Sequence, residues 1–190
     1  MAKWRSTVES LVGSMKFEST PINGAFVVQL NKIEDERGFF SRIFCQEEFE
    51  AHGLSNQVVQ SNLSHNTHKG TVRGMHYQIA PALETKLVRC IRGSIIDIIV
   101  DMRPESSTFK QHFSIKLDDT GGTALFVPCM CAHGFQTLED NTDVMYMVSG
   151  MYTPECERGL RHDDPQLGIH WPSPVEHISD KDQQWPLLRE

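Results

Sequence analysis

Short hydrophobic runs, separated by breaks at Gly, Pro, Asn and Asp, follow one another along the chain from Phe17 onwards. The runs are rich in Val, Ile, Phe and Thr, which are residues that favour strands. They predict β-strands at residues 26–30, 39–44, 57–62, 71–78, 85–91, 94–101, 111–117, 123–127, 134–137 and 143–149. Many short strands at this spacing are typical of an all-β sandwich or barrel.

Three further segments add detail to this strand pattern. The sequence LVRCIRGSIIDIIVDMR (87–103) predicts a hairpin that bends at Arg92-Gly93. The sequence QEEFEAH (46–52) predicts one helix, with Phe49 facing inward. Residues 153–190 are rich in Pro and Asp, so we expect them to wrap around the barrel rather than form a second domain.

The first 14 residues differ from the rest of the chain. Trp4, Val8, Leu11 and Val12 recur at helical spacing, which fits a short amphipathic helix. An added extension or an upstream start fits equally well, because Met15 begins a self-consistent segment. We therefore expect an N-terminal extension at 1–14, helical or disordered, and a single domain at 15–190. The length of 190 residues agrees with one domain.

Composition narrows the class of protein. The chain has 18 Lys and Arg against 25 Asp and Glu, a formal net charge of −7, whereas a general nucleic-acid binder usually carries a basic face. The sequence shows neither the run of roughly 18 apolar residues that a membrane span needs nor the h-region of a secretory signal. Five cysteines without C-x-x-C spacing favour free thiols in a reducing compartment. We expect a cytoplasmic protein with no nucleic-acid or membrane partner.

His76 lies in the alternating segment 71–78. Alternation with a bulge at the glycine predicts two faces, one with Arg73, Met75 and Tyr77 and the other with Val72, His76 and Gln78. An imidazole that points into a barrel can act as a base, a metal ligand or a hydrogen-bonded structural residue. The residue types alone favour the structural role.

Four other segments have side chains suited to acid–base chemistry, each with a structural alternative. Lys86 would lie on a solvated strand edge or, facing inward, stabilise an oxyanion. His133 would be a surface imidazole at a turn. Tyr146 and Tyr152 would be core aromatics or, in a cleft, general acids. The charged segment 178–182 would form a solvated loop, or one of its carboxylates would orient a histidine.

The residues disfavour a metal site of the cupin kind. Such barrels place His-x-His and a Glu on one motif and a further His on a second motif. Here His76 is followed by Tyr77-Gln78, and Glu84 is not at the expected offset. His76 and His133 remain, and two ligands make a poor site for a first-row metal.

Six motifs occur together in a recognisable order. They are DERGFF (35–40), GTVRGMHYQ (70–78), KLVR (86–89), AHGF (132–135), Tyr146 and SDKD (179–182). This order and spacing resembles the dTDP-4-dehydrorhamnose 3,5-epimerases and related nucleotide-sugar epimerases over about residues 17–188. The resemblance implies a double-stranded β-helix, a cupin-like jelly roll with few short helices. It also implies a homodimer without metal or organic cofactor, acting on a nucleotide-linked, 4-keto-6-deoxyhexose substrate.

The resemblance further implies catalytic roles. A ketone at C4 acidifies the C–H bonds at C3 and C5 of the sugar. His76 would remove a proton, with its imidazole oriented by Asp182. Lys86 would stabilise the C4 oxyanion, and Tyr146 would return a proton on the opposite face.

Substrate-binding positions follow from the same resemblance. Arg73 and Arg37 would meet the diphosphate, because a guanidinium suits phosphate oxygens. Arg37 could act across the dimer, from the partner's N-terminal segment. Tyr152 would stack on the nucleotide base. Further polar contacts would come from Gln60, Asn62, His133, Glu157 and Lys181.

Three features depart from the pattern of this family. Arg42 occupies a position that is often acidic, which bears on the identity of the nucleotide or sugar. Cys129-Met130-Cys131 replaces small residues and would change the shape of the pocket, and the segment between Gln60 and Arg73 is one residue longer. Two alternatives stay open on the sequence: epimerisation at only one carbon of a related nucleotide sugar, and a non-catalytic or metal-binding cupin-type sugar-binding protein.

Overall fold

The structure is a computed structural model that describes residues 14–188. Residues 1–13 of the predicted N-terminal extension lie outside this range. The strands are β1 (Lys16–Ser19), β2 (Phe26–Gln29), β3 (Ile33–Asp35), β4 (Gly38–Phe40), β5 (Gln60–Asn66), β6 (Val72–Gln78), β7 (Lys86–Arg92), β8 (Ser94–Asp101), β9 (His112–Asp118), β10 (Thr123–Val127), β11 (Cys131–Thr137), β12 (Thr142–Val148) and β13 (Glu157–Gly159). The short helices are α2 (Gln46–Ala51), the 3₁₀ turn η1 (Pro154–Cys156) and α3 (Asp180–Gln183).

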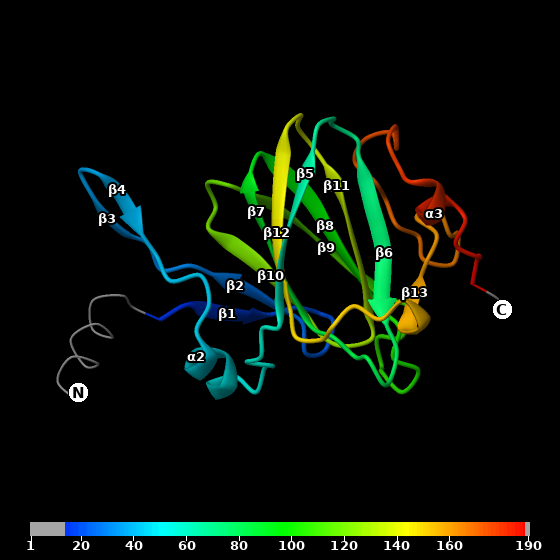
Figure 1. Ribbon diagram of the computed structural model, residues 1–190, viewed down its shortest axis with the longest axis horizontal. Helices are drawn as coiled ribbons and strands as arrows, with labels where there is room; N and C mark the ends of the chain where they lie inside the picture. Colours follow the sequence, from blue (N-terminus) through cyan, green and yellow to red (C-terminus); the bar gives the residue numbers. More distant parts are fainter. Residues whose placement is uncertain (1–13, 189–190) are drawn as a thin grey trace.

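Two antiparallel sheets face each other across the main core (Figure 1). One sheet has the strand order β1-β2-β10-β7-β12-β5, and the other has the order β13-β6-β11-β8-β9. Val88 and Leu125 of the first sheet pack with Ile99, Leu117 and Phe135 of the second. Burial of these inward faces is the main source of stability in a two-sheet fold. The predicted all-β jelly roll, a cupin-like double-stranded β-helix, is confirmed.

Strand β5 differs from its prediction in a way that concerns the site. Residues 57–62 were expected to form it because Val58 and Val59 are apolar, but both are exposed and the strand runs from Gln60 to Asn66. The strand is polar on both faces and is held by a ladder of seven pairs with β12. Its inner face lines a cavity instead of the core, so the alternation on which the prediction relied is absent.

The N-terminal hairpin projects away from the barrel (Figure 1). The prediction of a strand at 39–44 was wrong, since β4 ends at Phe40 and pairs only with β3. The side chains of Phe39 and Phe40 are exposed, although the Lys32 ammonium lies over the Phe39 ring. The short strands β1, β3 and β13 were not predicted.

The predicted helix and the bend at Gly93 are confirmed, but the predicted hairpin is wrong, because β7 pairs with β10 and β12 in one sheet and β8 pairs with β11 and β9 in the other. α2 buries Phe49 against Val28 and Phe126, on the outer face of the six-stranded sheet. β7 ends at Arg92 and β8 begins at Ser94, with Gly93 between them at a φ of +76° that suits glycine. Within residues 14–188, no helix is long and apolar enough to span a membrane.

The segment after β12 wraps around the five-stranded sheet, as expected. β13 pairs with β6, and Leu160 and Leu167 pack on the outer face of that sheet against Met75 and Ile98. The segment then returns along β6 as far as α3 (Figure 1). It therefore brings residues near position 180 beside the middle of the barrel.

Candidate active site

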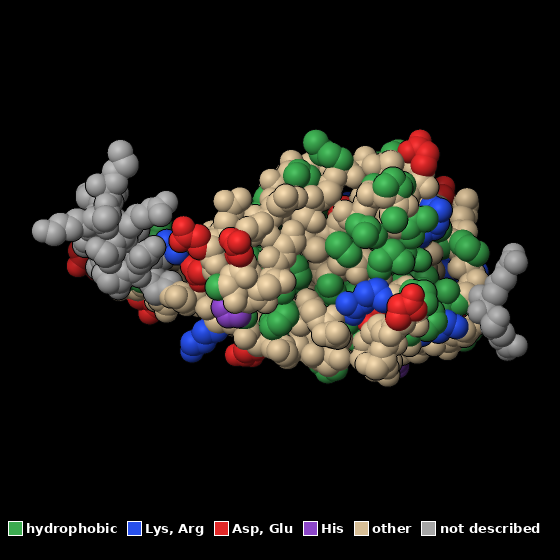
Figure 2. Space-filling model, turned by 90° about the horizontal axis from the view of Figure 1, so that it is seen from below, with side chains coloured by type: hydrophobic (Ala, Val, Ile, Leu, Met, Phe, Trp, Pro, Cys, Tyr) green, Lys and Arg blue, Asp and Glu red, His purple; other side chains and the backbone are tan. Residues whose placement is uncertain are grey.

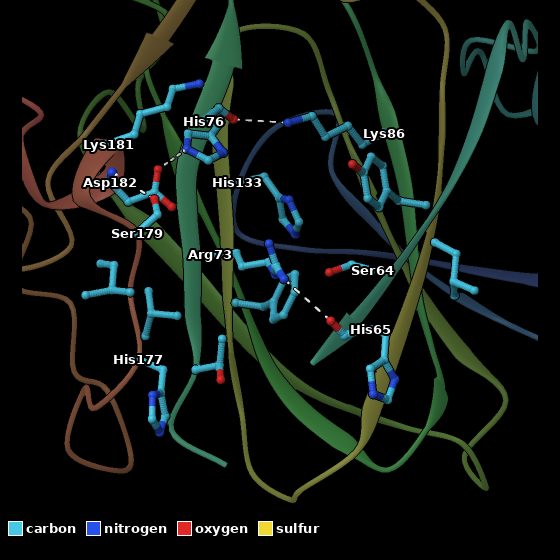
Figure 3. Close-up of a pocket in the computed structure, with 16 residues that line it drawn as sticks. Ser64, His65, Arg73, His76, Lys86, His133, His177, Ser179, Lys181 and Asp182 are labelled. Carbon is cyan, nitrogen blue, oxygen red and sulfur yellow. Dashed lines mark hydrogen bonds and ion pairs between the residues drawn. The ribbon is translucent and has the colours of Figure 1, made fainter. Parts of the chain in front are cut away.

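A cavity of about 700 Å³ lies between the strands and the C-terminal segment (Figure 3). β5, β6, β7, β11, β12 and α3 all contribute to its wall. The lining residues are Leu63, Ser64, His65, Thr71, Val72, Arg73, His76, Lys86, His133, Phe135, Tyr146, His177, Ile178, Ser179, Lys181 and Asp182. The four residues predicted to be catalytic are therefore brought to one cavity from four separate elements.

His76 and Asp182 form a hydrogen-bonded pair at the wall of this cavity. His76 Nε2 lies 2.6 Å from Asp182 Oδ1, and the backbone N–H of Gly74 donates to Oδ2 at 3.2 Å. The Ser179 hydroxyl accepts from the Asp182 N–H and caps α3. Burial alone would raise the pKa of Asp182, but the hydrogen bond and charge of His76 outweigh it and hold this pKa below its usual value. The carboxylate stays ionised and orients the imidazole.

A bulge in β6 sets the direction of its side chains. β11 advances two residues between His133 and Phe135, while β6 advances three residues between His76 and Arg73. Arg73 and His76 therefore both face the cavity, and Met75 is buried on the opposite side. The predicted face with Arg73, Met75 and Tyr77 together is wrong, because the extra residue changes the alternation between Arg73 and Met75.

Glycine makes this bulge possible. Gly74 has a φ of +119°, and a Cβ there would lie 2.6 Å from the Cα of Gly134 on β11. Any side chain at Gly74 would force the two strands apart.

Lys86 faces inward, so its alternative placement on a solvated edge is wrong. Its ammonium group donates to the backbone oxygen of His76 at 3.1 Å and lies 3.4 Å from Glu84 Oε1. Tyr146 also lines the cavity, from the neighbouring strand β12. Burial and the negative charge of Glu84 raise the pKa of Tyr146, while the charge of Arg73 lowers it by less. The phenol of Tyr146 therefore carries its proton at neutral pH.

His133 is a buried strand residue, so its placement at a surface turn is wrong. It stands opposite His76 in the ladder of β11 and β6. Its Nε2 lies 2.7 Å from Oδ1 of Asp97, a fully buried carboxyl on β8. Asp97 was not predicted, although it is the one charge within the apolar run of residues 95–100.

A smaller hollow of about 360 Å³ shares His76, Lys86 and Tyr146 with the cavity. Four predicted binding residues also line it: Gln60, Asn62, Tyr152 and Glu157. The Tyr152 hydroxyl donates to Glu157 Oε2 at 2.9 Å, and Lys181 Nζ donates to the same oxygen at 2.6 Å. The exposed ring of Tyr152 is thus linked through Glu157 to the ammonium group of Lys181.

Exposed apolar side chains lie next to residues of the smaller hollow in the sequence. In the view from below, hydrophobic side chains gather on the right-hand part of the molecule, with a few charged groups among them (Figure 2). Leu83 and Met151 are exposed, and each directly precedes a residue that lines the smaller hollow, Glu84 or Tyr152.

Arg37 is not brought to the cavity. It lies at the turn of the β3–β4 hairpin with an 84% exposed side chain and pairs with Asp35. Arg42 forms an ion pair with Glu48 at 2.9 Å, again outside the cavity. Cys131 packs in the main core, and neither Cys129 nor Cys131 is among the residues that line the two hollows.

Comparison with known proteins agrees with this geometry. Residues 19–190 match the family model described as dTDP-4-dehydrorhamnose 3,5-epimerase. The chain belongs to this family. It is 40% identical to the dTDP-4-dehydrorhamnose 3,5-epimerase of Sinorhizobium fredii over 177 residues, which cover 93% of this chain and 91% of that protein. A dTDP-4-dehydrorhamnose 3-epimerase from Streptomyces niveus is 33% identical, over 93% of this chain and 85% of that protein.

A solved structure extends the similarity to three dimensions. The dTDP-4-dehydrorhamnose 3,5-epimerase of Bacillus anthracis, crystallised with TDP and PPi bound, superposes with a TM-score of 0.89 at 38% identity. The match covers 92% of this chain and all of that chain (100%). As a member of the epimerase family, the chain is an isomerase. The family match spans all twelve predicted site residues, from Arg37 to Asp182.

Proposed function

We propose that this epimerase-family protein inverts C3 and C5 of a dTDP-linked 4-keto-6-deoxyhexose without a cofactor. The observation that carries the proposal is the His76–Asp182 pair in one cavity with Lys86 and Tyr146. Proton removal next to a ketone needs a base, a cation for the enolate oxygen and a proton donor on the other face. The cavity has one side chain for each task.

His76 is the proposed base. Its Nε2 is bonded to Asp182, which leaves Nδ1 to accept a proton. The C–H bond at C3 breaks, its electron pair forms the C3–C4 double bond, and the C4 carbonyl pair moves to oxygen. His76 becomes an imidazolium beside the ionised Asp182. A positioned base of this kind contributes roughly 10²–10⁴-fold to the rate.

Lys86 and Tyr146 complete the reaction. Lys86, whose side chain is only 11% exposed, is proposed to stabilise the C4 enolate oxygen with its ammonium group. Tyr146 then donates its proton to C3 from the opposite face as the ketone re-forms. His76 loses its proton to water and the Tyr146 phenolate regains one, so both groups return to their starting state. The same sequence at C5 gives the doubly inverted sugar.

The substrate's nucleotide portion is proposed to lie along the smaller hollow. Tyr152 would stack on the base, and Gln60, Asn62 and Glu157 would supply polar contacts there. Arg73 and His133 line the larger cavity, where Arg73 would meet the diphosphate. Lys181 would add a contact from α3.

We also propose that two copies of the chain form the working enzyme. Arg37 lies outside the cavity of its own chain, on a projecting hairpin whose Phe39 and Phe40 are exposed. An exposed apolar hairpin favours burial against a partner. In the dimer, Arg37 would reach the diphosphate in the partner's cavity. Five free cysteines support a location in the cytoplasm.

Proton NMR of dTDP-4-keto-6-deoxyglucose in D₂O with the protein tests the reaction. Loss of the C3 and C5 proton signals with new product couplings is the expected result. Loss of the C3 signal alone would assign the 3-epimerase activity by which the Streptomyces niveus relative is named. No exchange at either carbon would overturn the proposal.

Light scattering and an Arg37→Ala variant test the dimer. We expect a dimer at micromolar concentration and, for the variant, a KM raised roughly tenfold with little change in kcat. A monomeric active enzyme would contradict the shared site.

A further inference from the structure

Glu84 lies beside two of the proposed catalytic residues. Its Oε1 is 3.4 Å from Lys86 Nζ, and both side chains are 11% exposed. It lines the smaller hollow together with Tyr146. The sequence brought Glu84 to attention only as a metal ligand at the wrong offset, and the proposed reaction gives it no task.

The backbone holds Glu84 firmly against the end of β12. The Thr85 N–H donates to the Ser149 hydroxyl at 2.8 Å, and the Ser149 N–H donates to the Thr85 oxygen at 3.1 Å. A Cβ on Gly150 would lie 2.6 Å from the oxygen of Leu83 and 3.1 Å from the Cβ of Glu84. The backbone at Glu84 is therefore held close to the end of the strand that carries Tyr146.

A carboxylate with so little exposure needs a nearby cation. Lys86 supplies it, and the attraction holds the ammonium between Glu84 and the backbone oxygen of His76. The same negative charge disfavours a phenolate on Tyr146. The first effect positions the Lys86 ammonium, and the second keeps the proton on Tyr146.

We propose that Glu84 is a positioning residue for the epimerisation: its carboxylate holds the Lys86 ammonium at the enolate oxygen and places a negative charge in the hollow that Tyr146 lines. This inference rests on the proposed function. It differs from a purely structural ion pair, because a structural role would affect folding without affecting the titration of Tyr146.

Several charged or titratable groups face this part of the site. His76 and Arg73 come from β6, Lys86 from β7, Tyr146 from β12 and Glu157 from β13, with Tyr152 and Cys129 from adjoining loops. Without the charge of Glu84, burial would still raise the pKa of Tyr146 and the charge of Arg73 would still lower it. The pKa of Tyr146 would therefore be lower than in the wild type.

The test is Glu84→Gln, which keeps the shape of the side chain and removes its charge. The chain has three tyrosines, so ring-labelled tyrosine gives a simple carbon NMR spectrum, with Tyr146→Phe to identify the signal. We expect the pKa of Tyr146 in the resting enzyme to fall, because one of the two causes that raise it is removed. The alkaline limb of the kcat profile should shift to lower pH with it. Because Lys86 is no longer held at the enolate oxygen, kcat at pH 7 should drop roughly tenfold, while KM changes less than about twofold.

Two further variants separate charge from structure. Glu84→Asp keeps the charge and should restore most of the pH profile. Glu155→Gln removes an exposed charge on η1 and should leave the profile as in the wild type. A wild-type titration of Tyr146 in an active Glu84→Gln enzyme overturns the inference, whatever the loss of rate. A wild-type protein that exchanges no deuterium overturns the proposed function, and the Tyr146 titration still decides whether Glu84 sets that group's charge.

Discussion

His76 and His133 each hold an aspartate through Nε2, at 2.6 Å to Asp182 and 2.7 Å to Asp97, yet their side chains are 30% and 8% exposed. The first pair joins β6 to the C-terminal segment, and the second lies within one sheet. The Gly74 N–H bonds the second oxygen of Asp182, whereas the second oxygen of Asp97 is buried without a hydrogen-bond partner among the described residues.

The difference in exposure indicates that the two histidine–aspartate pairs serve different purposes. A base must meet substrate and return its proton to water, so access matters as much as orientation. The His76 pair has that access together with a fully bonded carboxylate. The His133–Asp97 pair is buried between β11 and β8, where it gives the cavity wall a fixed shape and polarity. Hydrogen-bond length alone would not have distinguished them.

Replacement of the two histidines should break the comparison most strongly. We expect His76→Ala to lower deuterium exchange at C3 and C5 roughly 10³-fold, because the base is gone. His133→Ala should cost only about tenfold, mainly through KM. Proton NMR of the substrate in D₂O measures both. Greater damage from His133→Ala would reverse the assignment of the base.

Replacement of the two aspartates should affect stability in the opposite order, with the larger loss at the partner of His133. Asp97→Asn should lower the free energy of unfolding by about 2–3 kcal/mol, because it disturbs a fully buried carboxyl and its histidine. Asp182→Asn should cost about 1 kcal/mol, since that site lies at the cavity wall. Urea denaturation of both variants beside the wild type checks the order. Equal losses would show that burial does not separate the pairs.

A single methyl group should disturb only the His76 pair. A Cβ on Gly159 would lie 2.0 Å from the Trp185 ring, which packs near His76 just after α3. Gly159→Ala should therefore displace α3, cost about 1–2 kcal/mol of stability and slow exchange roughly tenfold. Adding Trp185→Leu makes room for the methyl and should recover part of the loss. A crystal structure of Gly159→Ala with an unmoved Asp182 would contradict this account.

Low pH should have the smallest effect on stability of the changes considered. The pKa of Asp182 is lower in the folded protein than in the unfolded chain, so the folded state binds fewer protons there. Its contribution to stability is complete above its unfolded value near 3.9 and is lost as the pH falls through the lower folded value. Asp182→Asn should flatten the stability curve below about pH 4. An unchanged acid limb in denaturation at several pH values would argue against the shifted carboxyl.

Much of the fold could be predicted because its core strands follow simple hydrophobic patterns. The run 94–101 and the bend at Gly93 are examples. The limits were equally physical. β5 is polar because it faces the cavity, and the hairpin β3–β4 lies outside the barrel, so neither has a core-facing stripe. A bulge at Gly74 was expected, but the way it turns Arg73 and His76 to one face depends on close contact between Gly74 and Gly134, which lie on different strands.

The candidate site was found through motifs rather than through hydrophobic patterns. His76, Lys86, Tyr146 and Asp182 were named from their order in the chain, and the structure brings them to one cavity. Asp97 and Glu84 were missed because their importance depends on neighbours across strands, which no local pattern encodes. Arg37 was named, yet no single copy of the chain places it at the cavity.

The partner of His76 lies 106 positions further along the chain. During synthesis, the barrel strands leave the ribosome well before α3, because the chain grows from its N-terminus. In the growing chain, His76 is therefore present well before Asp182, the residue that orients its imidazole. In the proposed mechanism, His76 can act as an oriented base only after α3 has docked beside β6 and brought Asp182 within hydrogen-bond distance.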